Sequence, residues 1–579
     1  MSGVIETDIL VVGAGPAGAA TSVFLGDHGV RTLMISRHGG TAETPRAHIT
    51  NQRAMEALRD VGLEQICMLQ ASPATHIAHA FWLRSMAGEE LARTWAWGND
   101  PRRSGEYAAT SPCRISDLPQ TRLEPILVTE AARLGVDVRF GWELQSFDQD
   151  GDGVTAIVTE RLSGQPITIR ARYMVGADGA RSRVVELLDL PLVGQHGLGN
   201  VFNVLCDVDL SRHVEHRQGS LYSIIQPGNS YWAPVAVFRM VRPWNRWLVA
   251  LIVPQAAGKP EPTEADFAQR IRESIGDDSL PIRILSTSPW TINDVYAERY
   301  AAGRVFCMGD AVHRHPPTNG LGSNTCIQDA FNLAWKLALV VQGKADPALL
   351  DSYDAERKPV GEQIVARANK SFLQNNRVWD LLGAGTLTVL PEDGHAAVFD
   401  TVEGRATLRR EVDRFKYEYH AHGVEMQRNY VSDAVIPDGS PNGPDDDHDA
   451  ELVYRPNARP GSVVPHVWLA RRAPGPLVST LDVAGKRRFM LFTGPGGDRW
   501  RDAAREVSAA TGVEIAVTSI GPFCDYEDPY GWWPDLAATR EDGAVLVRPD
   551  HIVAWRVDSL PDAPSAMLAT AMQSILGFA

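Results

Sequence analysis

The chain has 579 residues, of which 44% are hydrophobic and 22% are charged. These values are typical of a globular protein and exclude a disordered chain, a collagen and a small disulfide scaffold. Lys and Arg total 56 against 71 Asp and Glu, so the formal net charge is −15. Because such a surface repels phosphate backbones and anionic lipids, we expect neither nucleic acid nor a membrane as a partner.

The six cysteines are scattered, without a Cys-x-x-Cys pair, at Cys67, Cys113, Cys206, Cys307, Cys326 and Cys524. This spacing suits neither a zinc ribbon nor a disulfide framework and indicates a reducing compartment. No apolar run reaches the ~18 residues of a membrane span. The first residues also lack the charged and then apolar pattern of a signal peptide, so we expect a cytoplasmic protein.

The N-terminal segment predicts a β-α-β unit. Asp8–Val12 is a short apolar run typical of a strand buried on both faces, and Arg31–Ile35 is a second strand. The segment between them is first Gly-rich and then spaced like a helix. A right-handed crossover would make the two strands parallel neighbours.

Further elements follow in chain order. Ser116–Leu134 predicts a helix, Val136–Phe140 a strand, and Val154–Glu160 with Ile167–Met174 a hairpin. Between Val201 and about Ser288, alternating strand patterns rich in aromatic residues indicate a β-rich second lobe. The next expected elements are a strand at Arg304–Met308, a helix at Gly320–Val341 and a helix at Ser352–Ser371 that is kinked near Pro359.

Pro, Gly and Asp crowd together at Pro437–Glu451, which is the composition of a linker or a surface loop. After it, strand and helix patterns alternate and predict a small third α/β unit. Its expected elements are Phe489–Thr493, Arg501–Thr511, Val513–Ser519 and Gly543–Val547.

The sequence GAGPAG comes directly after the first strand and opens the first helix. Gly13 permits a tight turn, Gly15 lets the backbone approach a diphosphate, and Gly18 allows close packing of helix and strand. The acidic residue that usually binds a ribose after the second strand is absent, and Ser36 and Arg37 stand there instead. The motif predicts a dinucleotide site with an altered ribose contact.

Two other segments combine a strand with a polar turn. Tyr173–Arg183 places Asp178 in an Asp-Gly pair, and Arg304–Leu337 places Asp310 after a strand and two glycines at the start of a helix. A carboxylate at the end of a strand can accept a hydroxyl proton from a ribityl or ribose chain. The open backbone N–H groups at residues 320–324 suit an anionic or carbonyl edge of a flavin.

Together with PRAHITNQRAMEALRDVGLE at Pro45–Glu64, these motifs resemble the single-component FAD-dependent aromatic hydroxylases of the p-hydroxybenzoate hydroxylase type, in their phenol-hydroxylase branch. The resemblance spans nearly the whole chain. It implies an α/β fold with a Rossmann-like FAD-binding domain, a β-rich substrate lobe and a C-terminal thioredoxin-like domain. The expected domains are 1–190 with 289–400 (FAD-binding), 191–288 (lobe), 401–450 (helical or linker region) and 451–579 (thioredoxin-like).

The resemblance also implies roles for single residues. Asp178 would help to hold FAD and to receive NADPH, and Asp310 would bind the ribityl chain. The other residues expected at FAD are Gly13, Gly15, Ala17, Gly18, Ser36, Arg37, Arg46, Gln120, Gly320, Leu321 and Gly322. NADPH (or NADH) would be a transient co-substrate, because the chain has a single strand-linked fingerprint and the family gives NADPH no Rossmann domain.

Three residues are expected to take part in the chemistry. A phenol reacts faster as phenolate, and a histidine with a pKa near ~6.5 is suited to taking its proton. We expect His48 to be this base and Asp117 to orient it; the alternative is a histidine with a structural hydrogen bond to a loop carbonyl. Pro316 would lie along the isoalloxazine. His313 and His315 have no third ligand in view, so no metal site is predicted.

The sequence therefore predicts a monooxygenase that uses NAD(P)H, O2 and a flavin C4a-hydroperoxide to hydroxylate a phenol or a hydroxylated heteroaromatic. An epoxidase or tailoring oxygenase for a bulky polyketide-like substrate, a reductase, and a non-catalytic flavin-fold binding protein remain alternatives. The intact GAGPAG, Asp178 and Asp310 argue against the non-catalytic protein. The expected partners are a small aromatic molecule and O2, and we expect a homo-oligomer.

Overall fold

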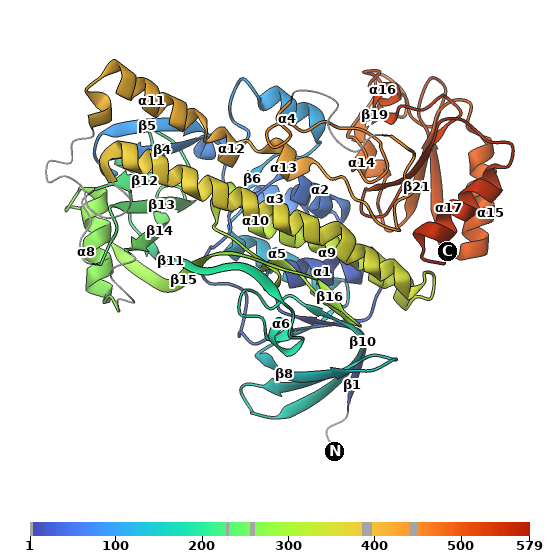
Figure 1. Cartoon of the computed structure of the whole chain (residues 1–579), viewed down its shortest axis with the longest axis horizontal. Coiled ribbons are helices and arrows are strands. Elements are labelled where there is room, and N and C mark those ends of the chain that lie inside the picture. The colour runs from blue at the N-terminus through green and yellow to red at the C-terminus, as the bar shows by residue number, and fades with distance from the viewer. Residues whose placement is uncertain (1–3, 227–230, 255–260, 385–396, 441–447, 579) are drawn as a thin grey trace.

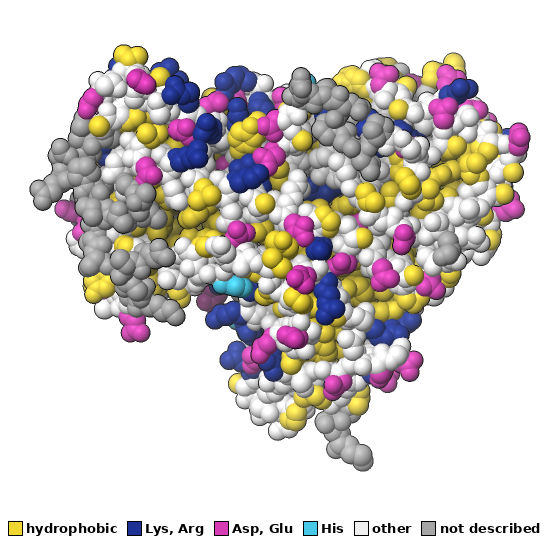
Figure 2. All heavy atoms as spheres, viewed as in Figure 1, with side chains coloured by type: hydrophobic (Ala, Val, Ile, Leu, Met, Phe, Trp, Pro, Cys, Tyr) yellow, Lys and Arg dark blue, Asp and Glu magenta, His cyan; other side chains and the backbone are white. Residues whose placement is uncertain are grey.

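The computed structural model describes residues 4–226, 231–254, 261–384, 397–440 and 448–578. The three larger sheets of the described residues and their helices lie around the long helix α10 (Asp351–Trp379), which crosses the molecule in Figure 1. The N-terminal sheet with β1, β8 and β10 lies below α10, a second sheet lies to the upper left, and the C-terminal sheet lies to the right. On the face seen in Figure 2, acidic and basic side chains are interspersed, and hydrophobic side chains gather over the C-terminal part.

The first sheet has the strand order β16-β17-β10-β1-β2-β7, with β8 and β9 as a hairpin on β10. Strands β7, β2, β1, β10 and β17 run parallel. The central residues of β1 are fully buried, as the apolar run predicted. The strands span Ile5–Val12 (β1), Thr32–Ser36 (β2), Asp137–Phe140 (β7), Trp142–Gln149 (β8), Val154–Glu160 (β9), Pro166–Gly176 (β10), Ala301–Ala302 (β16) and Val305–Cys307 (β17).

Helices cover this sheet. α1 packs against both α9 and α5, which belong to distant parts of the chain. The helices of this part are α1 (Pro16–Asp27), α2 (Gln52–Asp60), α3 (Glu64–Gln70), α5 (Gln120–Arg133), α6 (Arg183–Leu187) and α9 (Gly322–Val341).

Two expected helices differ in their bounds. The helix expected from Ser116 begins at Gln120, because Ser116–Asp117 instead forms strand β6, which pairs with β3 (Ile49–Thr50). The helix expected at Ser352–Ser371 is longer in the structure, because α10 continues through Pro359 as one helix to Trp379. Buried side chains on both sides of Pro359, including Tyr353 and Ile364, stabilise the helix despite the missing backbone hydrogen bond.

The β-rich lobe is an eight-stranded sheet in the order β18-β15-β11-β14-β13-β12-β4-β5. Strands β4 and β5 come from the segment that was assigned to the first domain, so strand pairing places residues 79–95 in the lobe. The strands span His79–Leu83 (β4), Glu90–Trp95 (β5), Leu192–Asp207 (β11), Leu221–Ile225 (β12), Val235–Arg242 (β13), Arg246–Val253 (β14), Arg283–Ala297 (β15) and His313–Arg314 (β18).

Short helices surround the lobe and lead to the third sheet. They are α4 (Ser104–Thr110), α7 (Ser211–Val214), α8 (Glu264–Ile275), α11 (Val402–Asp413), α12 (Lys416–Tyr419) and α13 (His422–Met426). Of the helices that the structure describes, none combines the length and the apolar character that crossing a membrane requires.

The C-terminal sheet has the order β22-β21-β23-β24, in which β21 and β22 are parallel and β23 is antiparallel to its neighbours. This order, with α15 and α17 packed together, confirms the thioredoxin-like domain. Its elements are β19 (Trp468–Ala470), β20 (Leu477–Ser479), α14 (Thr480–Val483), β21 (Phe489–Thr493), α15 (Arg499–Thr511), β22 (Ile515–Ser519), α16 (Trp533–Ala537), β23 (Ala544–Val547), β24 (Val553–Val557) and α17 (Pro564–Ile575). Cys524 is half-buried and unpaired.

Candidate active site

The turn between β1 and α1 fits a diphosphate. Gly13 has a φ of +116°, and a Cβ there would lie 2.1 Å from the Ala177 carbonyl oxygen; at Gly18 it would lie 1.9 Å from the Gly13 oxygen. At Gly15 the nearest atom would be 3.9 Å away, so this glycine leaves room for a ligand. No side chain caps the N-terminus of α1. The turn is therefore an open, positive helix end, as FAD binding requires.

Ser36 and Arg37 lie at the end of β2, beside this turn, where Gly13 N–H donates to the Ile35 carbonyl (2.8 Å). The Ser36 hydroxyl oxygen accepts the His38 backbone N–H at 3.3 Å. The Arg37 carbonyl oxygen accepts from the Arg161 guanidinium at 2.9 Å. The structure thus places both residues at the expected ribose edge.

Arg46 is exposed on a loop that Gln120 and Glu124 hold. Gln120 Nε2 donates to Glu124 Oε1 (2.6 Å), and Gln120 Oε1 accepts the Ala47 N–H (3.3 Å). Glu124 Oε2 accepts the Ala42 N–H at 2.6 Å. Burial raises the pKa of Glu124. Glu124 was not expected at the site, yet it is the nearest side chain to the open face of Gly15.

Asp178 follows β10, and its carboxylate accepts hydrogen bonds from the turn that comes after it. Its Oδ1 accepts from the Ser182 hydroxyl (2.5 Å), and its Oδ2 accepts the backbone N–H groups of Arg183 (2.6 Å) and Val184 (3.2 Å). Burial raises the pKa of this carboxyl. Asp178 is next to Ala177, against which Gly13 packs, so it borders the diphosphate turn.

Asp310 has an exposed carboxylate just after β17. Within the described residues, no hydrogen bond or ion pair commits this carboxylate to a protein partner. Gly309 has a φ of +62°, and a Cβ there would lie 3.1 Å from the Ala17 Cβ. The Gly309 turn therefore packs against α1, which brings Asp310 and Ala17 to one side of the sheet and leaves the carboxylate available to a ligand.

The loop from Pro316 to Gly322 lies against β3. A Cβ on Gly320, whose φ is +61°, would lie 3.0 Å from the Ile49 Cβ. Asn324 Nδ2 donates to the Ile49 carbonyl (2.8 Å). Pro316 and Leu321 are buried, and Gly322 begins α9, whose N-terminus has no side-chain cap. Ile49 directly follows His48 in the chain. The contact therefore brings the loop expected along the flavin ring close to His48.

His48, Asp117 and Arg239 form one buried cluster. His48 Nδ1 lies 3.4 Å from Asp117 Oδ1, and His48 Nε2 lies 3.2 Å from the Pro45 carbonyl oxygen. Arg239 donates to the same Asp117 oxygen at 2.8 Å. Burial and the Arg239 charge lower the pKa of His48. Burial alone would raise the pKa of Asp117, but Arg239 and His48 hold it below its usual range.

This cluster continues into an aromatic wall. Arg239 donates to the Ser220 carbonyl (3.1 Å), and the Ser220 hydroxyl accepts the Trp97 indole N–H (2.9 Å). Trp97 has a φ of +55°, a conformation that a bulky residue rarely adopts and that often marks a functional site. The Tyr419 ring meets the Trp97 ring edge-on, at 5.0 Å between centroids.

The expected residues thus gather around the first sheet and the 316–322 loop. Arg239 is paired with Asp117, and the sequence analysis did not identify it as a site residue. Trp97 and Tyr419 were missed as well. Their contacts join residues that are more than a hundred positions apart, so no local pattern could indicate them. In the described residues, no three His, Cys, Asp or Glu side chains are grouped so that they could hold a metal ion.

Comparison with known proteins places the chain among flavin enzymes. Residues 6–368 match a family described as FAD binding domain, and residues 457–579 match one described as aromatic-ring hydroxylase, C-terminal. The chain is 46% identical to 2,4-dichlorophenol 6-monooxygenase of Delftia acidovorans, over 99% of this chain and 98% of the relative. It is 40% identical to phenol 2-monooxygenase of Pseudomonas sp. (strain EST1001), over 98% and 92%. The solved flavin-dependent monooxygenase PieE in complex with FAD and substrate superposes with a TM-score of 0.93 at 43% identity, and 99% of each chain is covered.

Proposed function

Since the chain belongs to the family of FAD-dependent aromatic-ring hydroxylases, we propose that it hydroxylates a simple phenol with NADPH and O2. The chain is a flavoprotein monooxygenase, as its relatives are. In this reaction one oxygen atom enters the ring, the other leaves as water, and NADPH supplies two electrons. The choice of a phenol rests on the identity to two phenol monooxygenases over almost the whole chain.

The residues present fit FAD. The open face of Gly15 and the uncapped start of α1 suit the diphosphate, and the free Asp310 carboxylate suits a ribityl hydroxyl. The loop from Pro316 to Gly322 would lie along the ring system. When bound, FAD supplies electron transfer from NAD(P)H and the activation of O2.

We propose that His48 holds the proton of the phenol. Burial, and after it the Arg239 charge, keep the imidazole neutral near pH 7, so that it can accept a proton, and Asp117 then stabilises the imidazolium. In the structure His48 Nε2 faces the Pro45 carbonyl, so the ring must release this contact to reach a substrate. The aromatic wall of Trp97 and Tyr419 excludes water from the same space.

NADPH rather than NADH is proposed because the positive charges of several arginines act on His38, at the surface next to the end of β2. Burial is the largest cause that lowers the pKa of His38, and the charges of four arginines lower it further, so each of these arginines acts electrostatically on His38. They are Arg37, Arg161, Arg46 and Arg181. Such a cluster suits an additional phosphate. Arg181→Ala should lower the ratio of kcat/KM for NADPH over NADH; an unchanged ratio with weaker FAD binding would assign the cluster to FAD.

The proposed substrate class is tested by a screen. The purified protein should be yellow, and 2,4-dichlorophenol or phenol should accelerate NADPH oxidation and yield a product that is heavier by one oxygen atom. Turnover of a polyketide aromatic but of neither phenol would favour the tailoring oxygenase. A colourless protein that does not take up FAD would support the non-catalytic alternative.

We also propose a cellular compartment and an oligomeric state for the protein. The six unpaired thiols support a reducing, cytoplasmic environment. A homo-oligomer is the proposed assembly, and light scattering of the purified holoenzyme tests it.

A further inference from the structure

The Asn319 side chain joins the loop expected along the flavin ring (residues 316–322) to α12, which carries Tyr419 of the aromatic wall. Asn319 is buried, and its φ of +64° lies in the left-handed region that Asn tolerates better than most residues. Its Nδ2 donates to the carbonyl oxygens of Tyr417 (2.6 Å) and Glu418 (3.2 Å). Because both partners are acceptors, the amide nitrogen must face them.

These two carbonyls belong to the end of α12. A helix leaves its last carbonyl groups without internal partners, and Asn319 satisfies two of them in this helix of four residues. The Glu418 side chain extends elsewhere and accepts from Asn375 of α10 at 3.0 Å. α12 is therefore held from the flavin-ring loop on one side and from α10 on another.

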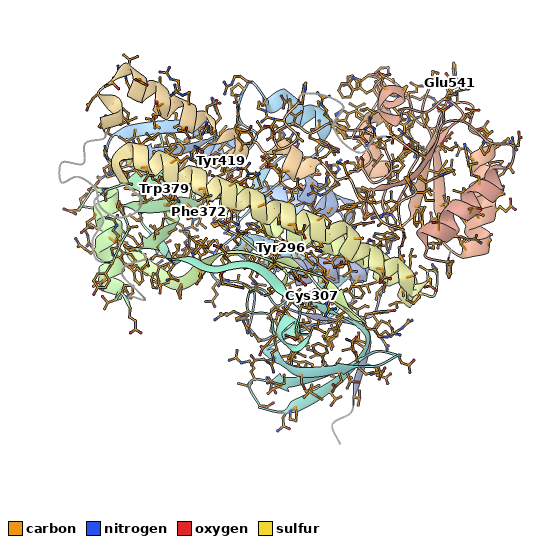
Figure 3. The ribbon with its side chains drawn as sticks, in the orientation of Figure 1. Tyr296, Cys307, Phe372, Trp379, Tyr419 and Glu541 are labelled. Carbon is orange, nitrogen blue, oxygen red and sulfur yellow. The ribbon has the colours of Figure 1, made fainter. Side chains whose placement is uncertain are left out.

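The next residue of α12 is Tyr419, which belongs to the aromatic wall. The Tyr419 ring contacts Trp97 and lies 5.9 Å from the Phe415 ring, centroid to centroid. The charge of Arg239 acts on the Tyr419 hydroxyl, which has no hydrogen-bond partner within the described part of the chain. In Figure 3, Tyr419 lies beside α10, near Trp379 and Phe372, which belong to the same hydrophobic cluster.

We propose that Asn319 is a positioning residue that couples an aromatic substrate at Tyr419 to the loop at the flavin ring. A substrate that touches Tyr419 displaces or orders α12, and the two hydrogen bonds carry this change to residues 316–322. The inference rests on the proposed function, since it assigns a path from the phenol to the flavin. It predicts that substrate loses much of its influence on the flavin when these bonds are absent.

The side chain has a feature that fits a coupling role. Asn319 Oδ1 is buried without a partner in the described residues, and an unsatisfied buried acceptor costs free energy. A glycine would adopt the same backbone conformation without this cost. The amide is therefore not needed for the turn itself.

The test compares holoenzyme variants with 2,4-dichlorophenol as the probe. Asn319→Gly retains the backbone conformation and removes the link, and Asn319→Asp retains the shape but replaces the donor by an acceptor. Both should bind FAD. In both, the flavin difference spectrum on adding the phenol and the acceleration of NADPH oxidation should fall about 2- to 30-fold, and more of the NADPH should be lost as H2O2.

Asn369→Asp is the matched control, because the Asn369 amide donates to the Val365 carbonyl (2.9 Å) within α10 instead of to α12. It should keep the response to the phenol. A full response in Asn319→Gly, or in Asn319→Asp, would overturn the coupling role while leaving the hydroxylase intact. A wild type without any response to the phenol would overturn both this inference and the proposed function.

Discussion

At the scale of single residues, the site depends on how Arg239 and His48 share the buried carboxylate of Asp117. Asp117 accepts from Arg239 and also faces His48, and all three side chains are buried. Arg239 stabilises the ionised Asp117 and opposes protonation of His48. After burial, the charge of a residue on strand β13 of the other sheet is therefore the main factor that lowers the pKa of His48.

Arg239→Met should move the acid limb of the hydroxylation rate to higher pH. Removal of the cation makes protonation of His48 easier, so its pKa rises, and the neutral base is lost at pH values where the wild type retains it. The measurement is kcat/KM for 2,4-dichlorophenol between about pH 5.5 and 9, with FAD occupancy determined at each point.

Arg242→Met is the matched control, since Arg242 is exposed on the same strand and bonds to Asn245. Its profile should follow the wild type. If the acid limb of Arg239→Met stayed in place with FAD bound, the assignment of His48 as the base would be refuted.

At the scale of elements, the four-residue helix α12 connects two parts of the proposed site. It carries Tyr419 into the aromatic wall and receives Asn319 from the flavin-ring loop. It also buries the Glu418 carboxyl, whose pKa is raised by burial to about 8. The folded chain therefore keeps a proton on Glu418 that the unfolded chain releases above pH ~4.5.

Glu418→Gln should reduce the loss of stability with rising pH. Between pH ~4.5 and 8 the folded state binds more protons than the unfolded state, so stability falls as pH rises. A glutamine side chain at this position does not titrate, so the variant lacks this contribution to the pH dependence of stability. We expect the drop in Tm between pH 5.5 and 8 to shrink by about 2–5 °C. Glu425, with its pKa also raised to about 8, should preserve part of the dependence.

Glu403→Gln on α11 provides the comparison, because Glu403 is exposed. Its melting curve should match the wild type at both pH values. Identical pH dependence in Glu418→Gln and the wild type would mean that Glu418 is ionised in the folded protein.

At the scale of the whole molecule, the C-terminal domain is joined to the flavin domain by a buried ionic network. Arg548 donates to both oxygens of Glu356 on α10 (2.6 and 2.9 Å) and to Asp550 (2.6 Å). Lys336 of α9 also donates to Glu356, at 2.9 Å. These side chains are 0–1% exposed. The domain is therefore a part of the structural core of the molecule.

Arg548→Met should destabilise the protein by about 3–5 kcal/mol, because it leaves the buried Asp550 carboxylate without its cation and Glu356 with Lys336 as its remaining cation. Arg540→Met is the control: Arg540 pairs with Asp558 at 3.1 Å on the surface, with side chains 75% and 65% exposed, and such pairs contribute about 0–1 kcal/mol. Thermal unfolding with release of FAD measures both. Equal melting temperatures for the two variants would show that the network does not join the domains.

The domain division remains a proposal. Strand pairing moves residues 79–95 from the first domain into the lobe. No signal near these residues could have indicated this, because a strand pattern states which residues alternate and not which sheet they join.

The sequence by itself determined the features that depend on neighbours along the chain. Gly13, Gly15 and Gly18 stand in one turn, and Asp310 follows its strand directly, so their placement could be predicted from local patterns and the resemblance. The tertiary structure alone decided that Arg239 lies beside Asp117 and His48, that Asn319 reaches α12 and that Arg548 joins two domains. The reason is physical: a guanidinium or an amide has the same local pattern at the surface and in the core, and only the packing of distant segments supplies its partner.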